Sequence, residues 1–281
     1  MSDLIGVIGP EIMFCFSGVM LFASWLLKTS LGRHALRHTP VRRNALTPAF
    51  LLVLLLVWQV LPSLLIWTLA GLTTTLPEWQ AWIVRNSVMC LASLLTILLI
   101  LVVVWRTFVR GIKGFGLSVR RLHIDLAQSV VVLFTLLPLV LAAIALTTYV
   151  GQQVDGPEYQ MKQHEELDVL IKHPQVISRL LVLLLAVVVA PLVEEMLFRG
   201  ILQSMLRSYL DWPWLVIGAC SVLFAAVHPD IAHWPALFVL SMGIGYAYEK
   251  SGSLWQAIFV HALFNGYSVL SVYRELYAGG S

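Results

Sequence analysis

The chain has 281 residues, of which 59% are hydrophobic and only 12% carry a charged side chain, and its formal net charge is +3. Soluble domains have about 25% charged residues, so this composition excludes an ordinary soluble domain and favours a membrane protein. The net charge is too small to indicate a nucleic-acid partner. The length allows several membrane-spanning helices of about 20 residues each.

In chain order, eight apolar stretches separated by polar connections predict transmembrane helices, at about 4–27, 49–72, 84–105, 127–150, 178–200, 213–229, 235–249 and 253–273. Pro62 and Pro138 fall inside the second and fourth stretches, where neighbouring helices of a membrane bundle tolerate proline. The expected fold is therefore all-α, a polytopic membrane helix bundle of about eight transmembrane helices.

The connections between these stretches differ in charge. The fourth, at about 151–177, is mainly acidic, whereas the first and third hold clusters of basic residues: Lys28, Arg33, Arg37, Arg42 and Arg43, then Arg106, Arg110, Lys113, Arg120 and Arg121. Cytoplasmic loops of membrane proteins carry an excess of Lys and Arg. The first and third connections are therefore predicted in the cytoplasm, and the N-terminus is predicted to be extracytoplasmic.

The composition of the apolar stretches changes once along the chain. Residues 1–150 form an N-terminal apolar region of four membrane helices, with few ionisable side chains inside them. Residues 151–177 follow as an acidic extracytoplasmic loop. Residues 178–281 contain helices that carry Glu, Arg, His and Asn within apolar sequence. Ionisable residues inside the bilayer are costly and mark functional sites, so the chemistry is expected in this last part.

Three of these residues lie on one predicted helix. Glu195 and Arg199 are four residues apart, so they share a helix face and can neutralise each other as a structural ion pair. Glu194 precedes Glu195 by one residue and points about 100° away from it. The helix is therefore predicted to present a neutralised pair on one side and a separate carboxylate, Glu194, on another.

His228 is the expected partner of Glu194. The chain turns near Asp211; Glu194 lies 17 residues before that position and His228 lies 17 residues after it. In two regular antiparallel helices, the two side chains would lie at the same depth, which permits contact without requiring it. A carboxylate and an imidazole together can activate a water molecule.

The last predicted helix adds two hydrogen-bond donors. His261 and Asn265 are four residues apart, so they lie on one face and could stabilise the oxyanion of a tetrahedral intermediate. Phe224 lies one turn before His228 and is expected to pack against its ring. Three other polar residues near span ends are expected at the water interface: Asp230, His233 and Glu249.

Three motifs occur in order on successive polar helices: Glu194-Glu195-x-x-x-Arg199, Phe224-x-x-x-His228 and His261-x-x-x-Asn265. With them the chain resembles the CPBP intramembrane proteases, the group that contains type II CAAX prenyl endopeptidases and bacteriocin-processing or immunity (ABI-like) proteins. The resemblance covers about residues 175–270. It implies an integral membrane endopeptidase, and we expect it in a bacterial inner (plasma) membrane.

The resemblance also implies roles for the motif residues. Glu194 would be the base that activates water, with assistance from His228. His261 and Asn265 would bind the oxyanion or the catalytic centre. The supporting residues would be Glu195, Arg199 and Phe224.

The dependence on a metal stays open in the sequence. Glu194, His228 and His261 could supply the nitrogen and oxygen ligands of a zinc site with an open position, as the label metalloendopeptidase given to the family implies. The same residues could act without any metal, as a Glu–His pair. No HExxH motif is present to decide between the two.

Other functions remain as alternatives to hydrolysis of a membrane-associated or lipidated protein or peptide. One is a non-proteolytic binding or bacteriocin-immunity membrane protein that keeps the motif as a structural network. Another is a proton- or ion-coupled transporter, although the sequence shows no internal repeat of the kind that many transporters have. The identity of the substrate, its prenylation and the oligomeric state stay open, and the expected surroundings are the lipid bilayer.

Overall fold

A computed structural model describes residues 2–161 and 175–278. These residues form helices and no strand; a single isolated bridge joins Asn44 to Phe108. The helices of the first part are α1 (Ser2–Lys28), α2 (Pro48–Thr68), α3 (Ala70–Thr73), α4 (Glu78–Thr107), α5 (Gly111–Phe115), η1 (Val119–Arg121) and α6 (Leu122–Asp155). The expected all-α membrane helix bundle is confirmed.

The second part begins with one long helix, residues 176–209, that changes between α and π geometry. Its segments are α8 (Val176–Leu183), η2 (Leu184–Val189), α9 (Ala190–Glu195), η3 (Met196–Gln203) and α10 (Ser204–Tyr209), where η2 and η3 are π-helical. The remaining helices are α11 (Pro213–Ala226), η4 (Ile231–His233), α12 (Trp234–Ser251) and α13 (Leu254–Ala278).

Each of the eight predicted stretches is largely helical, but α11 ends at Ala226, so His228 lies just beyond the helix on which it was predicted. Four helical segments are long and apolar enough to cross a membrane: residues 48–68, 78–107, 119–155 and 176–209; two shorter apolar helices cover residues 13–28 and 213–226. The total of eight membrane crossings stays a prediction. The acidic connection predicted at 151–177 begins later than expected because α6 continues to Asp155, and residues 162–174 of that connection lie outside the described residues.

The helix of residues 176–209 is longer than the predicted stretch, which ends at 200, and it is not a regular α-helix. Ile201, Leu202 and Met205 are buried in the bundle, so packing continues the helix past the predicted end. Pro191 has no N–H and cannot donate to the carbonyl four residues earlier. The π turns of η2 lie immediately before it, and such turns absorb a disrupted hydrogen-bond pattern.

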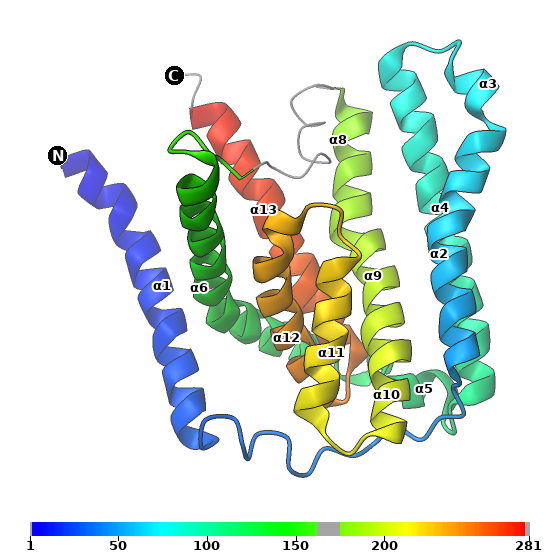
Figure 1. Ribbon diagram of the computed structural model, residues 1–281, viewed down its shortest axis with the longest axis horizontal. Helices are drawn as coiled ribbons and strands as arrows, with labels where there is room; N and C mark the ends of the chain where they lie inside the picture. The colour runs from blue at the N-terminus through cyan, green and yellow to red at the C-terminus, as the bar shows by residue number, and fades with distance from the viewer. Residues whose placement is uncertain (1, 162–174, 279–281) are drawn as a thin grey trace.

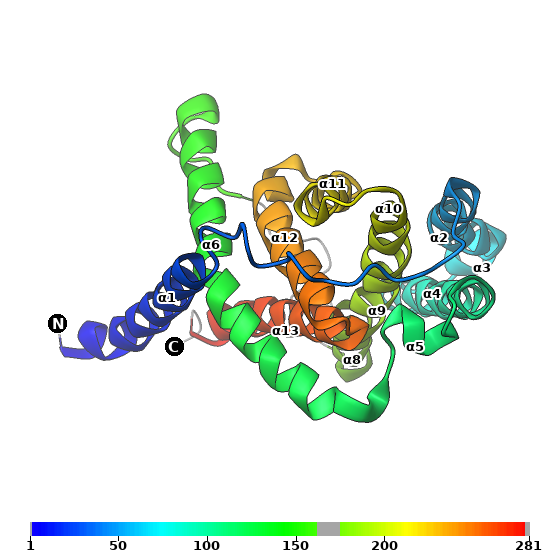
Figure 2. The same ribbon diagram turned by 90° about the horizontal axis from the view of Figure 1, so that it is seen from below.

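This long helix occupies the middle of the bundle (Figure 1). It packs against α2 and α4 on one side and against α11 and α13 on the other. Helix α1 packs at the far edge against α6, which changes direction along its length (Figure 2). Pro138 lies inside α6 and leaves the Phe134 carbonyl without its helical partner. Gly18 of α1 approaches that carbonyl so closely that a Cβ would overlap it.

The connection between α1 and α2 crosses one end of the bundle beneath α10, α11 and α12 (Figure 2). It is tied there by hydrogen bonds: Lys250 Nζ donates to Ala35 O at 2.8 Å, Asn44 Nδ2 donates to Ser204 O at 3.1 Å, and Tyr209 OH donates to Leu46 O at 3.2 Å. The N-terminal and C-terminal parts of the chain therefore form one packed bundle.

Glu249, expected at the water interface, is only 3% exposed. Its carboxylate accepts from Arg207 Nε at 2.9 Å, Thr39 Oγ1 at 3.1 Å and Gln203 Nε2 at 3.2 Å, and Arg42 lies 3.8 Å away. Partners from distant parts of the chain therefore neutralise Glu249 inside the protein, and its place at the water interface stays a prediction. His233 is buried as well and pairs with Asp230 at 3.6 Å.

Two helical glycines give a matched test of how closely α5 packs against the long helix. Gly200 faces the ring of Phe115, which a Cβ would overlap, whereas a Cβ on Gly218 would meet nothing within 4 Å. We expect Gly200→Ala to destabilise the protein by about 1–3 kcal/mol through overpacking. Gly218→Ala should be neutral or stabilise by up to about 1 kcal/mol, since Ala favours helices. Thermal unfolding in detergent measures both, and equal melting temperatures would contradict the close approach of α5.

Candidate functional site

Glu195 and Arg199 form the buried ion pair that their spacing predicts. Glu195 is 0% exposed and Arg199 is 1% exposed. Arg199 Nη1 donates to Glu195 Oε1 at 2.9 Å. Removing one member of such a pair leaves an uncompensated buried charge, which is strongly destabilising. The pair therefore contributes to holding the helix in the bundle.

Arg199 also binds α12 and α11. Its Nη2 atom donates to Ser241 Oγ at 2.7 Å and to Ser241 O at 3.2 Å, and its guanidinium carbon lies 4.7 Å from the centre of the Phe224 ring. Sequence reasoning did not find Ser241, because a serine among small residues in an apolar helix is typical of simple helix packing. The structure makes it the main link between α12 and the ion pair.

His261 lies against both glutamates. Its Nδ1 atom is 2.7 Å from Glu195 Oε1, and its Nε2 atom is 4.0 Å from Glu194 Oε2. A carboxylate only accepts hydrogen bonds, so Nδ1 carries the proton in this contact. Glu195 Oε1 therefore accepts from Arg199 and from His261 together. Glu195 orients His261 and directs the other ring nitrogen towards Glu194.

His228 is positioned by the end of α11. Its Nδ1 atom lies 2.8 Å from Phe224 O, and its own carbonyl accepts from Trp234 Nε1 at 3.0 Å. A carbonyl accepts and cannot donate, so Nδ1 is protonated and Nε2 of the neutral ring keeps its lone pair. The described residues show no hydrogen bond between His228 and Glu194, because the side chain folds back to cap its own helix.

Phe224 packs against both histidines, as expected for His228. Its ring centre lies 4.9 Å from that of His228 and 5.8 Å from that of His261, and the side chain is fully buried. Phe198 packs against the same ring at 5.2 Å, nearly edge-on. Since Arg199 also contacts this ring, one phenylalanine contacts the ion pair and both imidazoles.

Asn265 is on the same helix as His261 but makes a different contact. Its Nδ2 atom donates to Ala186 O at 2.7 Å. Ala186 lies in the π-helical segment η2, where the hydrogen-bond pattern of the α-helix is interrupted. Asn265 therefore uses one of its two amide protons to join α13 to the long helix, and the second proton is left for another acceptor.

The two glutamates differ in access. The Glu194 side chain is 15% exposed and the Glu195 side chain is 0% exposed. A water molecule or a peptide can therefore reach Glu194 more easily than Glu195. Glu195, Arg199 and Ser241 are joined by hydrogen bonds that hold His261 in place beside Glu194.

The donor chemistry of the three residues suits zinc. In each histidine Nδ1 is bound to an oxygen acceptor, and metal-binding histidines are held in this way by an outer acceptor. Glu194, His228 and His261 would be the ligands, and zinc would polarise a carbonyl and a bound water molecule. However, no three His, Cys, Asp or Glu side chains among the described residues gather closely enough to form a metal site, so the arrangement in the structure does not fit zinc although the donor types do.

Comparison with known proteins gives one family. Residues 176–267 match the family model described as "Type II CAAX prenyl endopeptidase Rce1-like". These residues are similar to that family. The match begins at the first residue of α8 and ends within α13, so the Rce1-like stretch contains every residue of the candidate site. With its apolar helices and this Rce1-like stretch, the chain is an integral membrane protein.

Two curated proteins are similar over part of the chain. A protein of Bacillus subtilis described as "Putative membrane peptidase YdiL" is 26% identical over 90 residues, which are 32% of this chain and 36% of that protein. An "Uncharacterized 24.3 kDa protein" of Escherichia coli is 30% identical over 128 residues, 44% of this chain and 58% of that protein. The similarity thus spans about a third to somewhat over half of these relatives. No solved structure matches the chain.

Proposed function

We propose that the chain is an intramembrane endopeptidase that hydrolyses a peptide bond of a membrane-associated or lipidated protein or peptide. The observation that carries the proposal is the position of His261, which touches the buried Glu195 and faces the more accessible Glu194. The Rce1-like match over the same residues supports a protease of the CAAX type. The loop charges favour an extracytoplasmic N-terminus in a bacterial inner membrane.

In the proposed reaction, Glu194 takes a proton from a water molecule, and Nε2 of His228 assists as a second acceptor. The water oxygen bonds to the carbonyl carbon of the substrate, and the carbonyl electron pair moves onto its oxygen. The proton then passes to the amide nitrogen, the C–N bond breaks, and an acid and an amine leave. These steps conserve atoms and charge.

His261 and Asn265 are proposed to stabilise the oxyanion. A protonated His261 donates from Nδ1 to Glu195 and still has the Nε2 proton to offer. Asn265 has its second amide proton, because the first is bound to Ala186 O. Donors held in place before the reaction stabilise the developing charge without reorganisation. Glu195 and the π turn of η2 would therefore fix the directions of the two donors.

A second candidate is a binding or immunity membrane protein without protease activity. The observation in its favour is that Glu195, Arg199, Ser241 and His261 already form a buried network, which would be useful as a structural lock alone. This candidate predicts that substitutions at Glu194 and His228 leave the phenotype of the protein unchanged.

His228→Ala provides a test that does not need a known substrate. Membrane fractions of cells that produce either the wild type or this variant are compared by quantitative proteomics, after equal amounts of both proteins in the membrane are confirmed. We expect an uncleaved precursor to accumulate in the variant, because the proposed second proton acceptor is lost. Identical proteomes would support the binding protein instead. A chelator applied to the purified wild type distinguishes metal-assisted from metal-free cleavage.

A further inference from the structure

An apolar cavity lies on another face of α12 from the Arg199–Ser241 contact. It has a volume of about 440 Å³ and is lined by side chains of α1, α6, α11 and α12, including Leu139, Val239 and Met242. This is within the range of about 300–1,000 Å³ typical of ligand sites. None of the glutamates or histidines of the candidate functional site lines it.

The polar atoms around this cavity are bound within the protein. Trp25 Nε1 donates to Tyr246 OH at 2.8 Å, Trp214 Nε1 donates to Gly32 O at 3.1 Å, and Thr135 Oγ1 donates to Val131 O at 2.8 Å. The indole and hydroxyl groups therefore hold the wall together, and the cavity presents mainly hydrocarbon. The occupant that this favours is a hydrocarbon chain.

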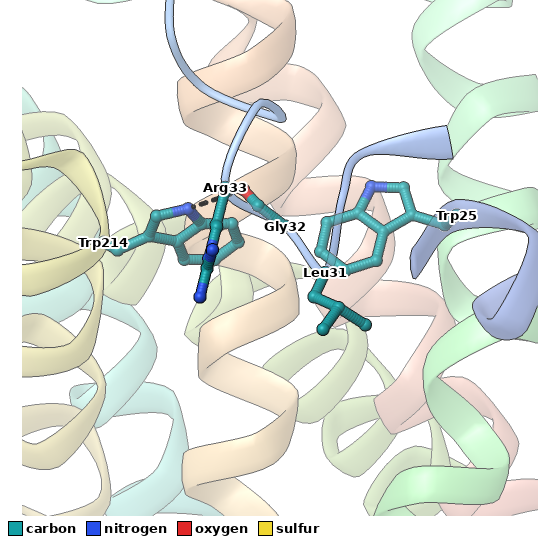
Figure 3. Close-up of a pocket in the computed structure, with 5 residues that line it drawn as sticks. All are labelled: Trp25, Leu31, Gly32, Arg33 and Trp214. Carbon is teal, nitrogen blue, oxygen red and sulfur yellow. Dashed lines mark hydrogen bonds between the residues drawn. The ribbon is translucent and has the colours of Figure 1, made fainter. Parts of the chain in front are cut away.

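A second cavity of about 250 Å³ adjoins the first at the end where α1 meets the connection to α2. The two cavities share Trp25 and Trp214, and the second is completed by Leu31, Gly32 and Arg33 (Figure 3). Trp214 and Tyr246 stack with 5.7 Å between ring centres, and Trp25 meets Tyr246 edge-on at 5.3 Å. Tryptophan and tyrosine gather at the headgroup level of a bilayer, so this end of the cavity suits a headgroup.

Arg33 supplies a cation at this end. Its side chain is exposed and makes no hydrogen bond or ion pair with any residue that the structure describes. No Asp or Glu occurs between positions 12 and 77 of the sequence. Asp211, which lies close to Trp214 in the sequence, forms no ion pair with Arg33 in the described parts of the chain. The charge near the aromatic residues is thus complementary to an anion.

We propose that the two adjoining cavities bind one anionic phospholipid, with an acyl chain in the larger cavity and the phosphate beside Arg33. A prenyl chain would fit the larger cavity but would leave Arg33 without an anion. Binding of the lipid joins α1 and α6 to α11 and α12 and does not depend on the proposed peptidase activity. Attraction of an anionic lipid to one basic residue is worth about 1 kcal/mol, or about fivefold in affinity.

The headgroup is tested with the full-length protein in detergent micelles, by native mass spectrometry with phosphatidylglycerol and phosphatidylcholine of equal acyl chains. We expect the wild type to prefer phosphatidylglycerol. Arg33→Gln should lower its affinity for that lipid about fivefold and leave phosphatidylcholine unaffected. Arg37→Gln is the matched control, because Arg37 is exposed in the same connection but lines neither cavity. Equal binding of the two lipids by the wild type, or no effect of Arg33→Gln, overturns the proposal.

The site proposed for the acyl chain is tested with Val239→Phe, which places a larger side chain in the larger cavity. Val222→Phe is its control, because Val222 is 56% exposed and lies outside the cavity. We expect only Val239→Phe to reduce retention of both lipids. Retention equal to that of the wild type overturns the assignment of the acyl chain. Displacement of phosphatidylglycerol by a farnesylated peptide would assign the cavity to a prenyl chain instead. The exposed Arg33 variant keeps the test valid if Val239→Phe fails to fold.

Discussion

Glu194→Gln should lower kcat for peptide cleavage by about 10²–10⁴-fold, the range that general acid–base catalysis contributes. The substitution keeps the shape of the side chain and removes only its ability to take a proton. Glu194 is 15% exposed, whereas Glu195 beside it is 0% exposed, so the protein should still insert and fold. KM should change little, since the binding surface keeps its shape.

Two controls make this result specific to Glu194. Glu78→Gln changes an exposed glutamate in the first turn of α4, and it should leave kcat at the wild-type value. Size-exclusion elution and thermal unfolding of Glu194→Gln should match the wild type, which separates loss of chemistry from loss of structure. A folded Glu194→Gln protein with full activity would remove Glu194 from the mechanism.

The second large effect is on stability. We expect Arg199→Met to lower the free energy of unfolding by about 3–5 kcal/mol, because it leaves the carboxylate of Glu195 buried with one partner fewer. The double variant Glu195→Gln/Arg199→Met should recover part of that loss, since the neutral amide needs no cation and can still accept from His261. Thermal unfolding in detergent measures all three proteins.

Arg106→Met is the matched control for this substitution. Arg106 lies in the last turn of α4 and is exposed, and exposed charges contribute about 0–1 kcal/mol. Its replacement should therefore have a small effect. If Arg199→Met were as stable as Arg106→Met, the buried pair would contribute nothing to the fold.

The helices could be predicted from the sequence because a long apolar run between polar connections can satisfy its backbone hydrogen bonds inside a membrane mainly by forming a helix. The Glu195–Arg199 pair was also predictable, since its spacing depends on local helix geometry alone. The histidine that faces Glu194 could not be predicted from the sequence. Equal chain separations give equal depth, but the π turns of η2 and η3 change the rotation of the long helix. Rotation decides which side chains meet, and His261 rather than His228 faces both glutamates.

The burial of Glu249 could not be predicted from the sequence for a related reason. Its partners Thr39 and Arg42 come from the first connection, and Gln203 and Arg207 come from the long helix. Nothing local to Glu249 indicates them, because these contacts depend on how the first connection crosses the end of the bundle. Without knowledge of these contacts, a charged residue near the end of an apolar stretch is expected at the water interface.

One oxygen atom, Glu195 Oε1, binds both the cation that stabilises the long helix and the imidazole that faces Glu194. A descendant of this protein that no longer needed to cleave peptides would still need Glu195, Arg199 and His261 in order to fold. Most of the motif would then survive in an inactive lineage. Glu194, which is more accessible than Glu195, is the position at which a loss of activity would first become visible in evolution.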